Sequence, residues 1–129
     1  MTARDGARAL AAGRVVAGAA LLAAPTLAGR GWIGRDAGRA GPRVFARGLG
    51  VRDLVLAGIA LHTVDNPQVG PRWVATCAAV DAVDCLVTIA ARRELPRLGG
   101  SAITAVAGTA AIGGAVLAQR LRASAPGVA

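Results

Sequence analysis

Four apolar stretches alternate with shorter polar ones along the chain. They cover about residues 9–28, 44–64, 72–91 and 101–119. Each is close to the roughly 20 residues that an α-helix needs to cross the hydrocarbon core of a bilayer. Short connections make consecutive helices antiparallel neighbours, as in a four-helix bundle. The pattern therefore predicts an all-α fold, a polytopic membrane protein with four transmembrane helices in a single membrane domain, residues 1–129.

The polar segments carry signals for turns. Residues 29–43 contain five glycines and a proline, so we expect a loop there. Asp65-Asn66-Pro67 predicts a turn, and Gly70-Pro71 the start of the third helix, because proline is favoured at the first helical position. Ser101 is the expected N-cap of the fourth helix.

Composition supports the membrane interpretation. Hydrophobic residues make up 54% of the chain and charged residues 17%, with a mean hydropathy of +0.52, a combination typical of membrane proteins. Trp32 and Trp73 fall at opposite ends of the predicted spans, as in interfacial belts.

The first stretch has an alternative interpretation as a secretory signal peptide, because a basic start precedes a short apolar run. Cleavage would leave three spans. We favour a retained helix, because Gly13, Ala17, Ala20 and Ala24 form a face of small residues at helical spacing, which favours helix association in lipid.

The net charge is +8, and all fifteen basic residues are arginine. They do not form a stripe, so we expect no nucleic-acid partner. Most lie at the ends of apolar stretches, where membrane proteins carry their topology signals. The first and third connections hold seven arginines outside the spans and the opposite side holds five. The positive-inside rule then places the first and third connections in the cytoplasm.

Arg52 and Asp53 lie near the centre of the second stretch. Its ten strongly apolar residues contribute about −0.5 kcal/mol each to insertion. The two charges cost about 2.5–3.5 kcal/mol each. These contributions nearly cancel, so we expect this helix to depend on its neighbours.

Asp53, Asp81 and Asp84 reach a common depth of about 13–18 Å at 1.5 Å per residue, and Arg14 reaches a similar depth from the first helix. The predicted buried polar cluster consists of Arg14, Arg47, Arg52, Asp53, Asp81 and Asp84. Two interpretations remain open. The cluster is an internal ion-pair network that fixes packing, which we favour, or a polar pathway or ligand site at mid-membrane. Because close carboxylates tend to share one proton, the second includes a proton-linked role.

Enzymatic chemistry has little support in the sequence. We find no nucleophile with a base, no phosphate-binding loop and no zinc signature, so we expect no enzyme, cofactor or metal site. His62 is the only histidine, and we interpret it as an interfacial residue. Cys77 and Cys85 are eight residues apart in one predicted helix, too far for a disulfide, and are expected as buried free thiols.

The run Ala46-Arg47-Gly48-Leu49-Gly50-Val51-Arg52-Asp53-Leu54, followed by Trp73 and Asp81-x-x-Asp84, resembles small four-helix integral membrane proteins of actinobacteria that are filed as a domain of unknown function. The resemblance covers most of the chain and implies four spans, an arginine–aspartate signature opening the second helix and paired aspartates in the third. It implies no activity.

Together these features predict an integral protein of the bacterial plasma membrane with a structural or accessory role. Its expected partners are the lipid bilayer and either a second copy or another membrane protein. The alternative is a small proton-coupled transporter or carrier that uses the mid-membrane charges.

Overall fold

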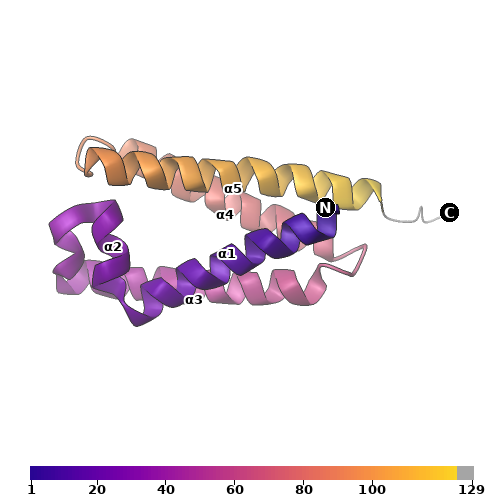
Figure 1. The fold of residues 1–129 in the computed structure, drawn as a ribbon, viewed down its shortest axis with the longest axis horizontal. Helices are drawn as coiled ribbons and strands as arrows, with labels where there is room; N and C mark the ends of the chain where they lie inside the picture. Colours follow the sequence, from indigo (N-terminus) through magenta and orange to yellow (C-terminus); the bar gives the residue numbers. More distant parts are fainter. Residues whose placement is uncertain (125–129) are drawn as a thin grey trace.

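The computed structural model describes residues 1–124, and nearly all of them are helical. The elements in chain order are α1 (Ala3–Ala23), α2 (Pro25–Ile33), the short 3-10 helix η1 (Gly34–Gly38), α3 (Ala40–Thr63), α4 (Gly70–Ala90) and α5 (Arg97–Ala123) (Figure 1). The predicted all-α fold is confirmed.

The four long helices are arranged as two pairs. α1 packs mainly on α3, and α4 packs mainly on α5, while contacts between the pairs are far fewer. Figure 1 shows the pairs as two layers, with α2 at one end of the space between them. The chain therefore does not form a bundle in which every neighbour packs equally closely.

The loop expected over residues 29–43 is wrong, because most of this segment is helical. Pro25 begins α2 at a position where its missing N–H needs no partner. Gly34 ends α2 with a φ of 67°, a conformation that favours glycine. α3 then begins at Ala40, and Pro42 is tolerated because it falls in the first turn.

The first predicted span, residues 9–28, is wrong, because it runs across the break between α1 and α2. The other boundaries are closer to expectation. α4 begins at Gly70, with Pro71 in its first turn. α5 begins at Arg97, with Pro96 as its N-cap residue, so the prediction that Ser101 is the N-cap is wrong. Residues 97–100 extend the helix by one turn.

Glycine allows α1 and α3 to touch through their backbones. A Cβ atom added to Gly50 would lie 2.6 Å from the carbonyl oxygen of Gly18, closer than real side chains come.

The small-residue face predicted on α1 is a different one, and it does not pack against a helix. A Cβ atom added to Gly13 would have no neighbour within 4 Å among the described residues. Ala17 and Ala20 are exposed.

The two pairs meet at both ends of the molecule. At one end, a hydrophobic cluster brings all four long helices together through Ala7, Val64, Val74, Ala118 and Leu121. At the other end, α2 reaches α5, where Gly31 and Gly99 are in backbone contact. The pairs are therefore held apart along their middle and joined at their ends.

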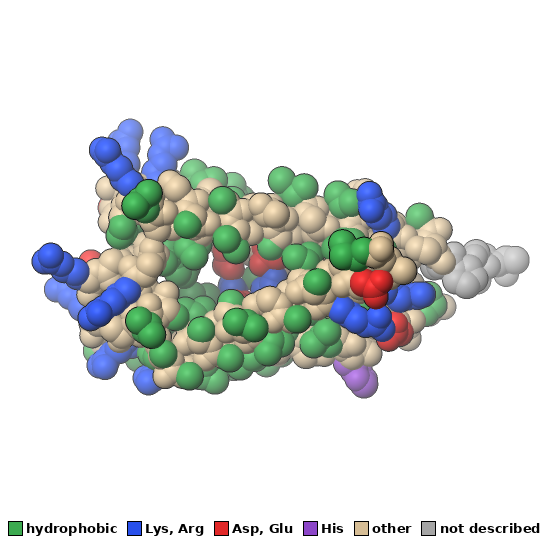
Figure 2. Space-filling view, in the orientation of Figure 1, with side chains coloured by type: hydrophobic (Ala, Val, Ile, Leu, Met, Phe, Trp, Pro, Cys, Tyr) green, Lys and Arg blue, Asp and Glu red, His purple; other side chains and the backbone are tan. Residues whose placement is uncertain are grey.

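Three helices, α1, α4 and α5, are long and apolar enough to cross a membrane. α3 has a similar length but carries Arg47, Arg52 and Asp53. Figure 2 shows arginine side chains gathered at the two ends of the molecule, with apolar side chains between them. This distribution matches a membrane protein, in which charges lie at the interfaces and apolar side chains face lipid.

Candidate functional site

Arg14 projects from α1 and contacts both α3 and α4. Its Nη1 donates to Oδ1 of Asp53 at 3.1 Å and its Nη2 donates to Oδ1 of Asp81 at 2.6 Å. Nη2 also lies 3.3 Å from the carbonyl oxygen of Cys77. The side chain is only 9% exposed. One guanidinium group therefore links three helices in a nearly buried position.

Arg52 makes the second connection between the helix pairs. Its Nη1 and Nη2 donate to Oδ1 and Oδ2 of Asp84 at 2.9 and 2.6 Å. This is the parallel two-bond arrangement in which arginine binds carboxylates most strongly. Nε and Nη2 also donate to Oδ1 of the adjacent Asp53, at 3.1 and 2.9 Å. Asp53 thus accepts from both arginines and joins the two connections.

We call these five residues the charge cluster: Arg14, Arg52, Asp53, Asp81 and Asp84. They come from α1, α3 and α4 and form one continuous network. Two guanidinium groups face three carboxylates, so the fully ionised cluster carries one excess negative charge.

Arg47, the sixth residue predicted for the cluster, lies outside it. The residue is exposed, and its Nε donates to the carbonyl oxygen of Leu22 at 3.4 Å. Five residues correspond to about 140° around a helix, so Arg47 points away from the face that carries Arg52. The six predicted residues, three arginines and three aspartates, would balance in charge, and this balance is lost because Arg47 lies elsewhere.

An open cleft of about 750 Å³ separates the two helix pairs. Its walls are mostly apolar, with small residues such as Ala17 and Ala20 from α1 facing Ile103 and Ala107 from α5. The charge cluster lines the same cleft, and Figure 2 shows blue and red side chains at its floor. The hydrophobic pattern of the sequence does not predict this cleft. The one sign of the cleft in the sequence is the predicted face of small residues on α1, because Gly13, Ala17 and Ala20 line the cleft.

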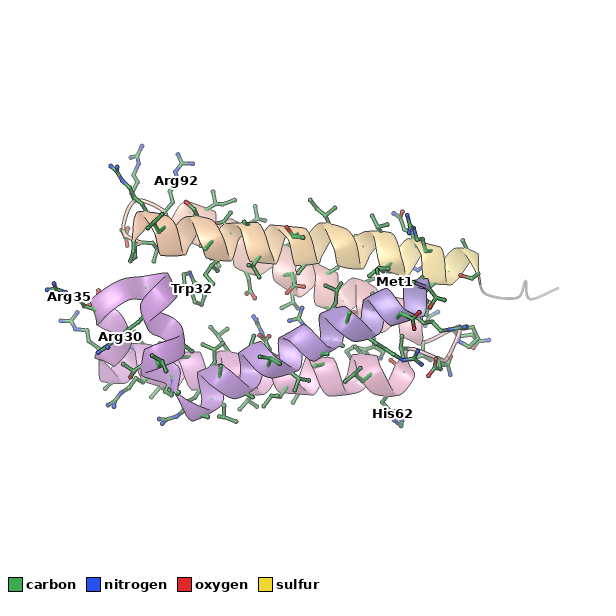
Figure 3. The ribbon with its side chains drawn as sticks, viewed as in Figure 1. Met1, Arg30, Trp32, Arg35, His62 and Arg92 are labelled. Atoms are coloured by element: carbon green, nitrogen blue, oxygen red, sulfur yellow. The ribbon has the colours of Figure 1, made fainter. Side chains whose placement is uncertain are left out.

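Trp32 also lines the cleft, at the end covered by α2. It projects from α2 into the space between the layers (Figure 3). Its indole Nε1 is buried and has no hydrogen-bond acceptor among residues 1–124, which is uncommon for a buried polar atom. The sequence predicts an interfacial position for this side chain, whereas in the structure it points toward the interior of the molecule.

The remaining candidate residues form no site of their own. Cys77 and Cys85 are both free and partly buried, each within hydrogen-bonding distance of a backbone carbonyl on a neighbouring helix. His62 is exposed near the end of α3 (Figure 3). Within residues 1–124, no group of three or more side chains is arranged to hold a metal ion.

No protein-family model matches the sequence, and no curated protein or solved structure matches it. The resemblance to four-helix actinobacterial membrane proteins therefore stays a prediction.

Proposed function

We propose that the chain is a four-span integral protein of the bacterial cell membrane, with a structural or accessory role rather than an enzymatic one. The observation that carries this proposal is the charge cluster, in which every member is paired and three helices are connected. Buried charges without partners are strongly destabilising, whereas a complete network fixes the arrangement of the helices that supply it.

The same network supports α3 as the fourth span. With 24 residues, α3 is about 36 Å long at 1.5 Å per residue, enough to cross the hydrocarbon core. Arg52 and Asp53 face partners inside the protein, which removes most of their cost in lipid. Arg47 lies about two turns from the start of α3, so its long side chain can extend toward the interface.

The arginines also suggest the orientation. Figure 3 places Arg30, Arg35 and Arg92 at the same end of the molecule, opposite His62. The same end carries the other arginines of the first and third connections. On the positive-inside rule, we place this end in the cytoplasm.

A charge exchange tests the structural role. We expect Arg52→Asp and Asp84→Arg each to lower the thermal stability of the purified protein in detergent, because each leaves like charges facing one another. The double variant restores the opposite pair and should recover much of the loss. The exposed pair Arg8 and Asp65, 2.7 Å apart, is the matched control. If the single variants at Arg52 and Asp84 lose no more thermal stability than the same charge changes at Arg8 and Asp65, the proposal is contradicted.

A second candidate function is a small proton-coupled carrier. It is favoured by a cleft that reaches the charge cluster and by the excess carboxylate in that cluster. Asp81 and Asp84 are three residues apart on α4 and share a face. The test is solute flux into liposomes across a pH gradient, with Asp81→Asn as the variant. Flux that does not respond to the gradient would exclude this candidate.

A further inference from the structure

Two carboxylate oxygens in the cleft have no hydrogen-bonded partner among residues 1–124. Asp53 and Asp81 each accept through Oδ1, and within the described residues neither Oδ2 atom accepts a hydrogen bond. Their side chains are 12% and 14% exposed, and both residues line the cleft. The excess negative charge of the cluster is therefore accessible from the open space between the helix pairs.

The cleft around these oxygens has the size and character of a ligand site. Its volume of about 750 Å³ falls within the roughly 300–1,000 Å³ of typical small-molecule pockets. Apolar walls with a few convergent polar groups are also typical of such pockets. Trp32 contributes an indole at the α2 end, with a buried N–H that lacks an acceptor.

The charges discriminate between classes of ligand. The guanidinium groups of Arg14 and Arg52 are already engaged by carboxylates, so an anion would have to compete for them and would meet three aspartates. A wholly apolar occupant would leave the excess charge without compensation at low dielectric, which is costly. A cation with an apolar body compensates the excess negative charge of the cluster and also packs against the apolar walls of the cleft.

We propose that this cleft binds an amphipathic organic monocation, with its charge near the free oxygens of Asp53 and Asp81 and its apolar body between α1 and α5. The inference rests on the proposed placement of the protein in a membrane, because the ligand would enter from the lipid phase through the open side of the cleft. It assigns a chemical class to the site and does not depend on whether the ligand is transported.

Tetraphenylphosphonium and tetraphenylborate provide a sharp test, because they have nearly the same shape and opposite charge. Binding of each to the purified full chain in detergent is measured by equilibrium dialysis. We expect the cation to bind at least about tenfold more tightly, which corresponds to about 1.4 kcal/mol. Equal binding of the two ions would show that they only partition into apolar surface, and would overturn the proposal.

Two pairs of variants locate the site. Asp81→Asn removes the carboxylate and should abolish the preference for the cation, whereas Asp65→Asn, at the exposed end, should keep it. Because Asp81→Asn also removes a partner of Arg14, a second pair leaves the cluster intact. Ala20→Leu places bulk in the cleft and should weaken cation binding, whereas Ala19→Leu on the same helix is exposed outside the cleft and should not. Unchanged binding in Ala20→Leu would overturn the proposal.

The failure of this inference and of the proposed function are separable. The charge exchange at Arg52 and Asp84 is measured by thermal unfolding, without either of the two probe ions. If the double variant recovers stability and the two probe ions bind equally, the structural role stands and only the ligand class is wrong.

Discussion

The contact inside the α1/α3 pair and the contact between the two pairs are built in opposite ways. Inside the pair, Gly18 and Gly50 bring two backbones together, and the ion pair of Arg14 and Asp53 adds to this close contact. Between the pairs, the helices are separated by a cleft, and Arg14 and Arg52 reach across to aspartates on α4. Close packing of small residues is effective where backbones can touch, whereas a gap has to be spanned by long side chains.

This difference predicts two kinds of sensitivity. The contact inside the pair depends on shape and should respond to a single methyl group. The contact between the pairs at the charge cluster depends on charge and should respond to loss of one ionised partner while tolerating changes of size nearby. The following changes test this distinction, from the largest expected effect to the smallest.

Arg14→Leu should have the largest effect. It removes the cation that pairs with both Asp53 and Asp81 and leaves two nearly buried carboxylates without it. Breaking a buried ion pair in this way costs about 3–5 kcal/mol. Thermal or denaturant unfolding of the purified protein in detergent gives the measurement. A loss below about 1 kcal/mol, the range of an exposed pair, would show that the cluster does not hold the pairs together.

Gly50→Ala should destabilise the α1/α3 contact by about 1–3 kcal/mol, the usual cost of overpacking. The added Cβ would lie 2.6 Å from the carbonyl oxygen of Gly18 and 2.9 Å from the amide nitrogen of Leu22, and backbone atoms cannot rotate away. The matched control is Gly48→Ala on the same helix, where nothing lies within 4 Å. Because alanine favours helix over glycine, the control should be neutral or slightly stabilising. Equal effects of the two changes would refute the close contact.

Gly99→Ala should act locally, at the end of the cleft that α2 covers. Its Cβ would overlap the carbonyl group of Gly31, so α2 has to move away from α5 and expose Trp32. In a Trp73→Phe background, we expect a red-shifted Trp32 emission and stronger quenching by acrylamide, with little change in global stability. Gly113→Ala, also in α5 but with no neighbour within 4 Å, is the control. An unchanged emission spectrum in Gly99→Ala would mean that this contact does not hold α2 in place.

Asp65→Asn should have the smallest effect. Asp65 pairs with Arg8 at 2.7 Å and lies 3.9 Å from Arg4, but its side chain is 67% exposed. Exposed pairs contribute about 0–1 kcal/mol and are screened by salt. Unfolding at low and high ionic strength measures this contribution. A loss comparable to that of Arg14→Leu would remove the distinction between exposed and buried pairs in this protein.

Five of the six residues predicted for a buried polar cluster are neighbours in the structure, because depth along a helix follows from residue count alone. A rise of 1.5 Å per residue places Arg14, Asp53 and Asp81 at similar heights in adjacent antiparallel helices. The prediction is wrong for Arg47, because this residue lies about 140° around α3 from Arg52 and is exposed. The segment of residues 29–43 was misread because glycine is a weak helix former that tertiary contacts can override.

The sequence by itself determined the all-α class, the approximate limits of three of the four long helices, and the relative heights at which their charges meet. These features depend on local periodicity, apolar length and helical rise. Only the tertiary structure decided that α1 pairs with α3 and α4 with α5, that α2 closes one end, and that a cleft exposes the carboxylates of Asp53 and Asp81. Those outcomes depend on which helix faces approach closely enough for backbones to touch, as at Gly18 and Gly50, and no single segment contains that information.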